Sequence, residues 1–375
     1  MNAKRITALA LALVMTLLLA ACGSKTVVND DGTKTEQTER GVKVTQTAAK
    51  AVQTEKYETA DFSMTIPKGW TVTTGGTNIY HSIRVYDPAE PLNQMFVLLK
   101  ADVLLHSQAG KEAWQQNYSM GNTQAALFTK AAVLDNPSTE GFFKIFSQYT
   151  AFASAVEPAY SGYPFPRFDN FTVSDRYPSA SPLKSSALGD EQLRATFTDN
   201  GKEGEGLFAA SVVDFGSFAI SNGNVVGYQL QAVDGGYYMA YNIVAVTAAK
   251  DTFIEWEGVL TDCFKTLQYS DSFVSATNQA SNEKVALAQQ VSQNFNATMD
   301  GFMSSWESRN RSQDIMSQKQ SDATLGYERV YDTETGEIYK ATNGFTDVYD
   351  GKRYKAVTDD NMYAEPVSGY IEKQS

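Results

Sequence analysis

Residues 62–72 have the sequence FSMTIPKGWTV, and this stretch indicates where the folded part of the chain begins. Phe62, Met64 and Ile66 alternate with polar residues, as in a β-strand that is buried on one face. The next four residues, Pro-Lys-Gly-Trp, form a turn because proline and glycine supply the dihedral angles that tight turns need. The last two begin a second strand. We therefore expect folded structure to begin at about Tyr57, with a β-hairpin.

The rest of the chain up to about residue 270 predicts strands and helices without a regular βαβ alternation. Strands are expected at residues 79–86, 95–101, 193–197, 207–214, 227–232 and 237–246. Helices are expected at about residues 109–130, 139–155 and 251–267, the last with apolar residues at helical spacing. A Pro-rich stretch, residues 157–182, is expected to be a long ordered loop. This pattern predicts an α+β fold.

The stretch 62–72 also resembles the first hairpin of PsbP-like domains, an α/β sandwich family first known from an extrinsic photosystem subunit. The resemblance is confined to this stretch. It implies a non-catalytic scaffold in which helices cover an antiparallel sheet, and it implies no functional residues.

The N-terminus has the pattern of a bacterial lipoprotein signal peptide. Two basic residues precede an apolar run, residues 6–21, which is shorter than the roughly 20 residues of a membrane-spanning helix. The run ends in Leu19-Ala20-Ala21-Cys22, which resembles the lipobox. The resemblance implies cleavage after Ala21 and a covalent diacylglyceryl lipid on Cys22, with no other cofactor.

A lipid on Cys22 predicts an extracytoplasmic protein anchored to the cell membrane, or to the outer membrane if the host has one. Two acyl chains anchor stably, since each buried CH₂ contributes about 0.8 kcal/mol. The next residue is Gly23 rather than the Asp that favours inner-membrane retention. With Cys22 lipidated, Cys263 has no cysteine left to pair with, so packing rather than a disulfide must hold the fold.

The formal net charge of −12 limits the partners that the chain can bind. Nucleic acid repels so acidic a protein, so no nucleic-acid partner is expected. Anionic lipid repels it as well, so contact with a membrane is expected through the lipid anchor.

Composition along the chain predicts five segments. They are a signal peptide (1–21), a flexible tether (22–56), an α+β PsbP-like domain (57–270), a long amphipathic helix (271–320) and a small β-meander (321–375). The tether is polar and has no aromatic residue before Tyr57. The helix has one apolar stripe, clearest over residues 282–318. Hairpin-turn residues in the tail are Asp332–Gly336, Asn343-Gly344 and Asp350-Gly351.

The common catalytic patterns fail on residue type or spacing. His81 and His106 are the only histidines, and neither has a second ligand at metal spacing. Cys263 falls on the packed face of its predicted helix, as a core residue does. Ser-x-x-Lys occurs at 181–184 and 281–284, and we reject both, since the first lies in the Pro-rich loop rather than at a helix start.

Two acidic patterns are also rejected. Asp332–Gly336 begins like a calcium loop, but Glu337 and Asn343 stand where an EF-hand needs Gly and Glu. Glu203 and Glu205 form an acidic pair in a glycine-rich stretch that is expected to be a solvated turn. The sequence therefore predicts no catalytic residue and no metal site.

Tyrosines are concentrated in the tail. They could form an aromatic binding surface, because tyrosine rings stack on sugars and on partner proteins. The residues of this candidate surface are Tyr327, Tyr331, Tyr339, Tyr349 and Tyr354. The alternative, which we favour, is cross-strand packing within a thin domain.

These observations favour a non-enzymatic binding or scaffold module at the cell envelope, whose partner would be an envelope protein or a cell-wall glycan. One alternative is a folding or assembly factor that holds clients on the apolar stripe of the long helix. Another is a metal-free hydrolase that uses carboxylates in the Pro-rich cleft.

Overall fold

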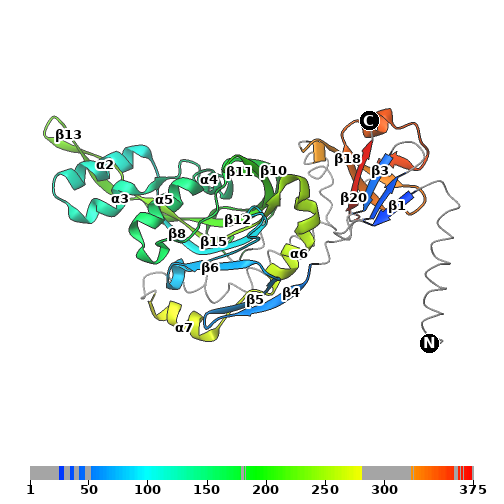
Figure 1. Ribbon diagram of the computed structural model, residues 1–375. Helices are drawn as coiled ribbons and strands as arrows, with labels where there is room; N and C mark the ends of the chain where they lie inside the picture. Colours follow the sequence, from blue (N-terminus) through cyan, green and yellow to red (C-terminus); the bar gives the residue numbers. More distant parts are fainter. Residues whose placement is uncertain are drawn as a thin grey trace. The chain divides into compact units, whose positions relative to one another are not determined.

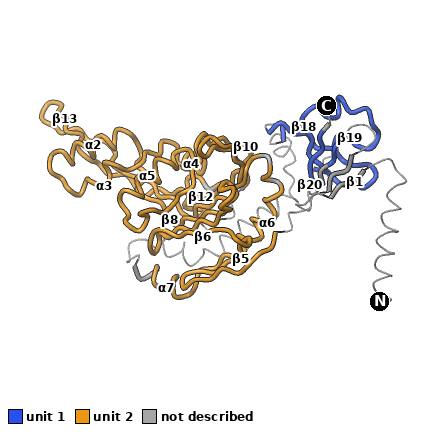
Figure 2. Tube along the Cα trace, viewed as in Figure 1, with its two compact units in different colours: residues 1–51, 310–375 blue, residues 52–309 orange. Residues whose placement is uncertain are grey.

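The computed structural model describes residues 25–28, 34–37, 42–46, 52–178, 181, 183–280, 322–323, 325–358, 362–363, 365 and 367–373. The chain divides into two compact units. Unit 1 comprises residues 1–51 together with 310–375, and unit 2 comprises residues 52–309 (Figure 2). The described residues form mainly antiparallel sheets with fewer helices, which confirms the predicted α+β class.

Unit 2 is built around an eight-stranded sheet (Figure 1). The strand order is β10-β11-β12-β15-β8-β7-β6, and β9 lies beside β8 as the one parallel neighbour in this sheet. The strands are β6 (Thr71–Gly75), β7 (Ser82–Tyr86), β8 (Gln94–Leu105), β9 (Ala132–Val133), β10 (Asp169–Pro178), β11 (Ala187–Asp199), β12 (Lys202–Gly216) and β15 (Tyr237–Ala249). The strands predicted at 95–101, 193–197, 207–214 and 237–246 lie within them and are confirmed.

The long strands are apolar on both faces, because both faces of the sheet are covered. Met95 and Phe96, neighbours on β8, belong to different hydrophobic clusters on opposite sides. Helices α4 (Thr139–Lys144) and α5 (Phe146–Val156) contribute to the cluster of Phe96. Helix α6 (Phe253–Lys265) contributes to the cluster of Met95.

Helix α6 has the packed face that its apolar spacing predicts. Phe253, Trp256, Leu260 and Phe264 are all buried in one cluster. Cys263 is buried with them, and burial raises the pKa of its thiol to about 11. The thiol is therefore protonated at neutral pH, and Cys263 is a packing residue as expected.

Residues 62–72 form two strands and a turn, but the two strands do not pair with each other. Strand β5 (Phe62–Pro67) pairs with β4 (Thr54–Glu58) and β16 (Gln268–Tyr269), whereas β6 pairs with β7 in the large sheet. Gly69, at φ +84°, turns the chain from one sheet into the other. The predicted hairpin is wrong, because a turn pattern specifies a local reversal but not the partner of each strand.

The helix predicted at 109–130 is interrupted. It forms α2 (Gln108–Ser119) and α3 (Ala126–Lys130), with Gly121 at φ +99° and a 3-10 turn between them. Ser107 caps α2, since its hydroxyl accepts a hydrogen bond from the Gly110 N–H at 3.1 Å.

A hairpin lies between β12 and β15. Its strands β13 (Ala219–Val226) and β14 (Gln229–Asp234) pair only with each other in the described part of the chain. The ribbon extends away from the large sheet at the end of unit 2 where α2 and α3 lie (Figure 1). Residues 227–232, predicted as one strand, form its turn and the start of β14.

Part of the Pro-rich stretch 157–182 is a strand rather than a loop. A 3-10 turn, Pro158–Tyr160, leads through a loop into β10, the edge strand of the large sheet. The prolines flank β10 or lie at its last residue, so its interior can form ladder hydrogen bonds. The prediction of a long loop is therefore correct only for the first half.

Unit 1 combines the first strands of the chain with the last. Its strands are β1 (Lys25–Val28), β2 (Lys34–Gln37), β3 (Val42–Gln46), β17 (Tyr327–Asp332), β18 (Ile338–Thr342), β19 (Tyr354–Ala356) and β20 (Val367–Lys373), in the order β1-β2-β3-β20-β18-β17-β19. The prediction of a flexible tether over 22–56 is thus wrong where the chain forms β1, β2 and β3 of this unit and the first part of β4 of unit 2. Val42 and Val44 supply the reason, because both are buried in an apolar cluster with Ile371.

The tail is more complex than the predicted meander. The turn at Asp332–Gly336 does join two antiparallel strands, β17 and β18, as expected. However, β20 lies parallel to β18, and Asn343-Gly344 precedes a short helix, α11 (Phe345–Val348), rather than a hairpin strand. The predicted helix over 282–318 lies outside the described residues.

Candidate binding surface

Several of the residues considered for catalysis lie in internal contacts. The His81 imidazole is buried, with Nδ1 3.2 Å from the Tyr269 hydroxyl oxygen. Ser181 is buried 3.1 Å from the Ser211 hydroxyl, whereas Lys184 is exposed. The other Ser-x-x-Lys match, 281–284, lies outside the described residues.

The acidic pair at 203 and 205 is divided between two separate ion pairs. Glu205 is buried 2.5 Å from Nε of Arg194, and Glu203 lies 3.2 Å from Nζ of Lys250 at the surface. Burial alone would lower the pKa of Arg194, but the attraction of Glu205 and Glu257 raises it overall. The guanidinium therefore stays charged and neutralises Glu205 within the core.

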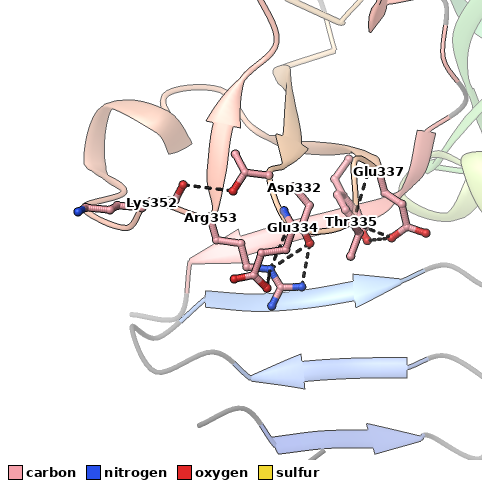
Figure 3. A network of polar contacts seen from close by, with 8 residues as sticks. Asp332, Glu334, Thr335, Glu337, Lys352 and Arg353 are labelled. Carbon is pink, nitrogen blue, oxygen red and sulfur yellow. Dashed lines mark hydrogen bonds and ion pairs between the residues drawn. The ribbon is translucent and has the colours of Figure 1, made fainter. Parts of the chain in front are cut away.

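An arginine binds the carboxylate of Asp332 at the start of the β17–β18 turn (Figure 3). Arg353 donates from Nε and Nη2 to the Asp332 carboxylate at 3.0 and 2.8 Å, and the Glu334 N–H donates to it at 2.9 Å. Burial acts to raise the pKa of Asp332, but these donors lower it overall. The carboxylate oxygens that resemble the start of a calcium loop are thus engaged by protein donors.

The tail tyrosines do not form one shared surface. Tyr339 and Tyr354 are buried, at 1% and 2% exposure, in the cluster that contains Val42 and Ile371. Tyr349 stacks on Phe345, and Tyr327 packs edge-on against Tyr370, while Tyr331 is half-buried. The proposed binding surface is therefore wrong for Tyr339 and Tyr354, and the favoured alternative, cross-strand packing, applies to them.

The Pro-rich segment borders a cavity of about 330 Å³, the place where the hydrolase hypothesis would put two carboxylates. The residues that line it are Ser147, Thr150, Ala151, Ser154, Tyr163, Phe165, Pro166 and Arg167. None of these is Asp or Glu. In the part of the chain that the structure describes, no three His, Cys, Asp or Glu side chains cluster in a way that could hold a metal ion.

The exposed surface of unit 2 has one distinctive region, which we call the hairpin lobe and define as residues 113–129 and 215–233. It comprises most of α2, nearly all of α3 and the β13–β14 hairpin. Neither range contains Asp, Glu, Lys, Arg or His, although 20% of the whole chain is charged. The two ranges belong together because Nδ2 of Asn117 donates to the Ser221 carbonyl at 2.7 Å.

Apolar side chains are exposed on this lobe far more than elsewhere. The exposed large apolar residues of the lobe are Tyr118, Met120, Leu127, Phe215, Phe218, Val225, Val226, Tyr228 and Leu230. Outside the lobe, the described residues expose only Val156, Leu188 and Val348 in this way. Exposed apolar side chains gathered on neighbouring elements in this way are typical of an interaction site.

Aromatic packing joins the elements at the base of the lobe. The rings of Trp114 and Phe128 stack at 4.2 Å and join α2 to α3. The indole N–H of Trp114 donates to the Gly235 carbonyl at 3.0 Å, just after the hairpin. A cavity of about 280 Å³ lies here, lined by Ser217, Phe218, Ala219, Ala232, Val233 and Asp234.

His106 joins the two ends of the hairpin segment. Its Nδ1 lies 2.8 Å from Asp234 and its Nε2 3.1 Å from Asp214, and Tyr238 packs on the ring at 4.0 Å. Burial acts to raise the pKa of Asp234, but hydrogen bonds from His106, the Gly236 N–H and Ser217 lower it overall. Because the Ser217 hydroxyl bonds to Asp234 and not to His106, the group has the geometry of a brace rather than of a nucleophile with its base.

Motif patterns in the sequence did not identify the hairpin lobe. Its two charge-free ranges were nevertheless visible, bounded by Glu112 and Lys130 in one case and by Asp214 and Asp234 in the other. What the sequence could not show is that α2 packs against the hairpin, which brings the two ranges together.

No protein-family model matches the chain, and no curated protein is significantly similar to it. None of the helices in the described part of the chain combines the length and the apolar character that crossing a bilayer requires.

Proposed function

We propose that the protein is a membrane-anchored extracytoplasmic lipoprotein that acts as a non-enzymatic binding or scaffold module at the cell envelope. The observation that carries the binding role is the hairpin lobe, a charge-free apolar surface on an otherwise acidic chain. The lipobox-like residues 19–22 support the anchor, with cleavage after Ala21 and a diacylglyceryl group on Cys22.

The finer description of unit 2 as PsbP-like is also a proposal. Helices on both sides of a large antiparallel sheet support it. The separation of β5 and β6 into different sheets counts against it, since the resemblance rests on a hairpin over residues 62–72. The binding role does not depend on this classification.

Cys22→Ser in the full chain, expressed in a bacterial host, tests the anchor. We expect the wild-type protein to lose residues 1–21, to gain the mass of the lipid and to fractionate with membranes. The variant should carry no lipid and keep its N-terminal segment. Mass spectrometry of the intact protein measures the lipid and the cleavage. A variant with the same lipid mass and the same processing as the wild type would contradict the anchor.

The binding role is tested on the mature chain, residues 22–375 with Cys22→Ser, which carries neither the lipid nor the apolar run 6–21. This chain is mixed with sedimented cell envelopes, and the bound fraction is compared with that of a chain that also carries Val226→Asp. Leu188→Asp is the matched control, because it places the same carboxylate at an exposed apolar residue of unit 2 outside the lobe. We expect Val226→Asp alone to lower binding, and equal binding of both variants would contradict the proposal.

A further inference from the structure

We infer that the tip of the hairpin lobe inserts into the surface of a lipid bilayer. This inference names the partner of the binding surface and rests on the proposed function. It concerns residues at the end of the ribbon farthest from the large sheet, around the turn between β13 and β14 (Figure 1).

The tip exposes apolar side chains on both faces of the ribbon, although Gln229, the partner of Val226 across the ladder, is polar. Val225 and Val226 are consecutive in β13, so their side chains point to opposite faces, yet they are 60% and 66% exposed. Leu230, the partner of Val225 across the ladder, is 66% exposed, and Tyr228 in the turn is fully exposed. A protein that docks on one face would leave the other face in water, whereas a bilayer surrounds an inserted tip on all sides.

The area of the tip also favours lipid. Four protruding side chains can bury on the order of a few hundred Å², which is below the roughly 800 Å² that each partner contributes to a stable protein interface. A bilayer needs no matching shape, and apolar side chains in its interface contribute in proportion to their buried area.

Charge decides which part of the protein can approach a membrane. The chain has a formal net charge of −12, so most of its surface is repelled by anionic lipid. The hairpin lobe contains no ionisable Asp, Glu, Lys, Arg or His side chain over 215–233, so its tip meets neither this repulsion nor the cost of burying a charge.

The backbone limits how deep the tip can go. In a two-stranded ribbon each strand has one edge outside the ladder, and such edges cannot enter the hydrocarbon core. The tip therefore reaches the interface, about 5–10 Å into the boundary between headgroups and acyl chains. Tyr228 suits this depth, since its ring is apolar and its hydroxyl can stay hydrated.

A label at the tip tests the inference. Tyr228→Cys in the mature chain, residues 22–375 with Cys22→Ser, gives one reactive thiol, because Cys263 is buried and burial raises its pKa to about 11. The thiol is labelled with an environment-sensitive fluorophore and mixed with phosphatidylcholine vesicles, with and without phosphatidylglycerol. The matched control carries the label at Leu188→Cys. The readout is local to the label, so it does not depend on how the N-terminus attaches.

We expect vesicles to shift the emission of the Tyr228→Cys label to the blue, and nitroxide lipids with shallow spin labels to quench it, while the Leu188→Cys label changes little. Adding Val226→Asp and Leu230→Asp should weaken the tip's vesicle contact by about tenfold or more, because a carboxylate in the apolar interface is costly.

Two results would overturn the inference. One is a Tyr228→Cys label that responds to vesicles no more than the Leu188→Cys label. The other is a label that responds to delipidated envelope protein but not to vesicles, which would keep the hairpin lobe as a binding surface and assign it to a protein partner. Failure of the proposed binding role would be a different result from both, because it requires that Val226→Asp leave envelope binding unchanged.

Discussion

At the residue scale, the buried imidazole of His81 links the stability of unit 2 to pH. His81 is 5% exposed and lies among the rings of Phe62, Tyr269 and Phe273. Burial lowers its pKa to about 4, and the charge of Asp61 opposes this to a smaller extent. The imidazole is therefore neutral in the folded protein at pH values where the unfolded chain already binds a proton.

This difference predicts a loss of stability in acid. The pKa of His81 is lower in the folded state than the unfolded value of about 6.5, so the unfolded state takes up a proton first as the pH falls. Protonation of His81 in the unfolded state should therefore lower the free energy of unfolding by about 2 kcal/mol between pH 7 and pH 5. Denaturant unfolding at both pH values measures it, and His81→Gln should reduce the difference by that amount. A variant with the wild-type pH dependence would show that another group is responsible.

At the element scale, the hairpin depends on helix α2 for its position. β13 and β14 form a sheet of only two strands, which is marginal alone in water. The side-chain amide of Asn117 donates both to Ala113 in its own helix, at 2.8 Å, and to Ser221 in the hairpin, at 2.7 Å. One side chain thus joins the two halves of the hairpin lobe.

Asn117→Ala should loosen the hairpin without unfolding unit 2. The loss of the two hydrogen bonds should lower the local stability of residues 219–234 by about 1–2 kcal/mol, which corresponds to roughly five- to thirtyfold faster amide exchange there. Hydrogen–deuterium exchange with mass spectrometry measures this. Gln115→Ala is the control, since Gln115 is exposed and donates to Thr129 rather than to the hairpin. Equal exchange in both variants would refute the role of Asn117.

Element positions were predictable where one local pattern determined them. Helix α6 was predicted because its buried residues recur at helical spacing, and the central strands because apolar runs are long enough to identify. The pairing of β5 could not be predicted, because one of its partner strands, β16, lies about two hundred residues later in the chain. Likewise, tyrosine content alone could not show that Tyr339 and Tyr354 point into a core.

At the scale of the whole molecule, the two ends of the chain build one unit. Strand β3 pairs with β20 from Val42, opposite Lys373, to Gln46, opposite Gly369. A sequence pattern cannot reveal such a pairing, because residues 22–56 are polar apart from a few small apolar residues and resemble a spacer. The segment that follows Cys22 therefore includes strands of a folded unit, whereas its composition predicts only a tether.

Val44→Asp tests whether this unit depends on its N-terminal strand. Val44 is 2% exposed in the cluster with Val330, Tyr339 and Ile371, so an unpaired carboxylate there should cost about 2–5 kcal/mol, enough to disrupt a small sheet. Amide exchange should then accelerate in residues 327–342 and 367–373.

Lys43→Asp is the matched control, because it places the same side chain at the neighbouring, more exposed position of β3, near Glu372. Residues 237–249 of the large sheet, which has its own core, serve as the internal reference. If Val44→Asp leaves exchange in 367–373 at the level of Lys43→Asp, β3 is not an integral strand of unit 1. The N-terminal segment would then act as the flexible spacer that its composition predicts, and the proposed anchor would be connected to the folded protein only through a tether.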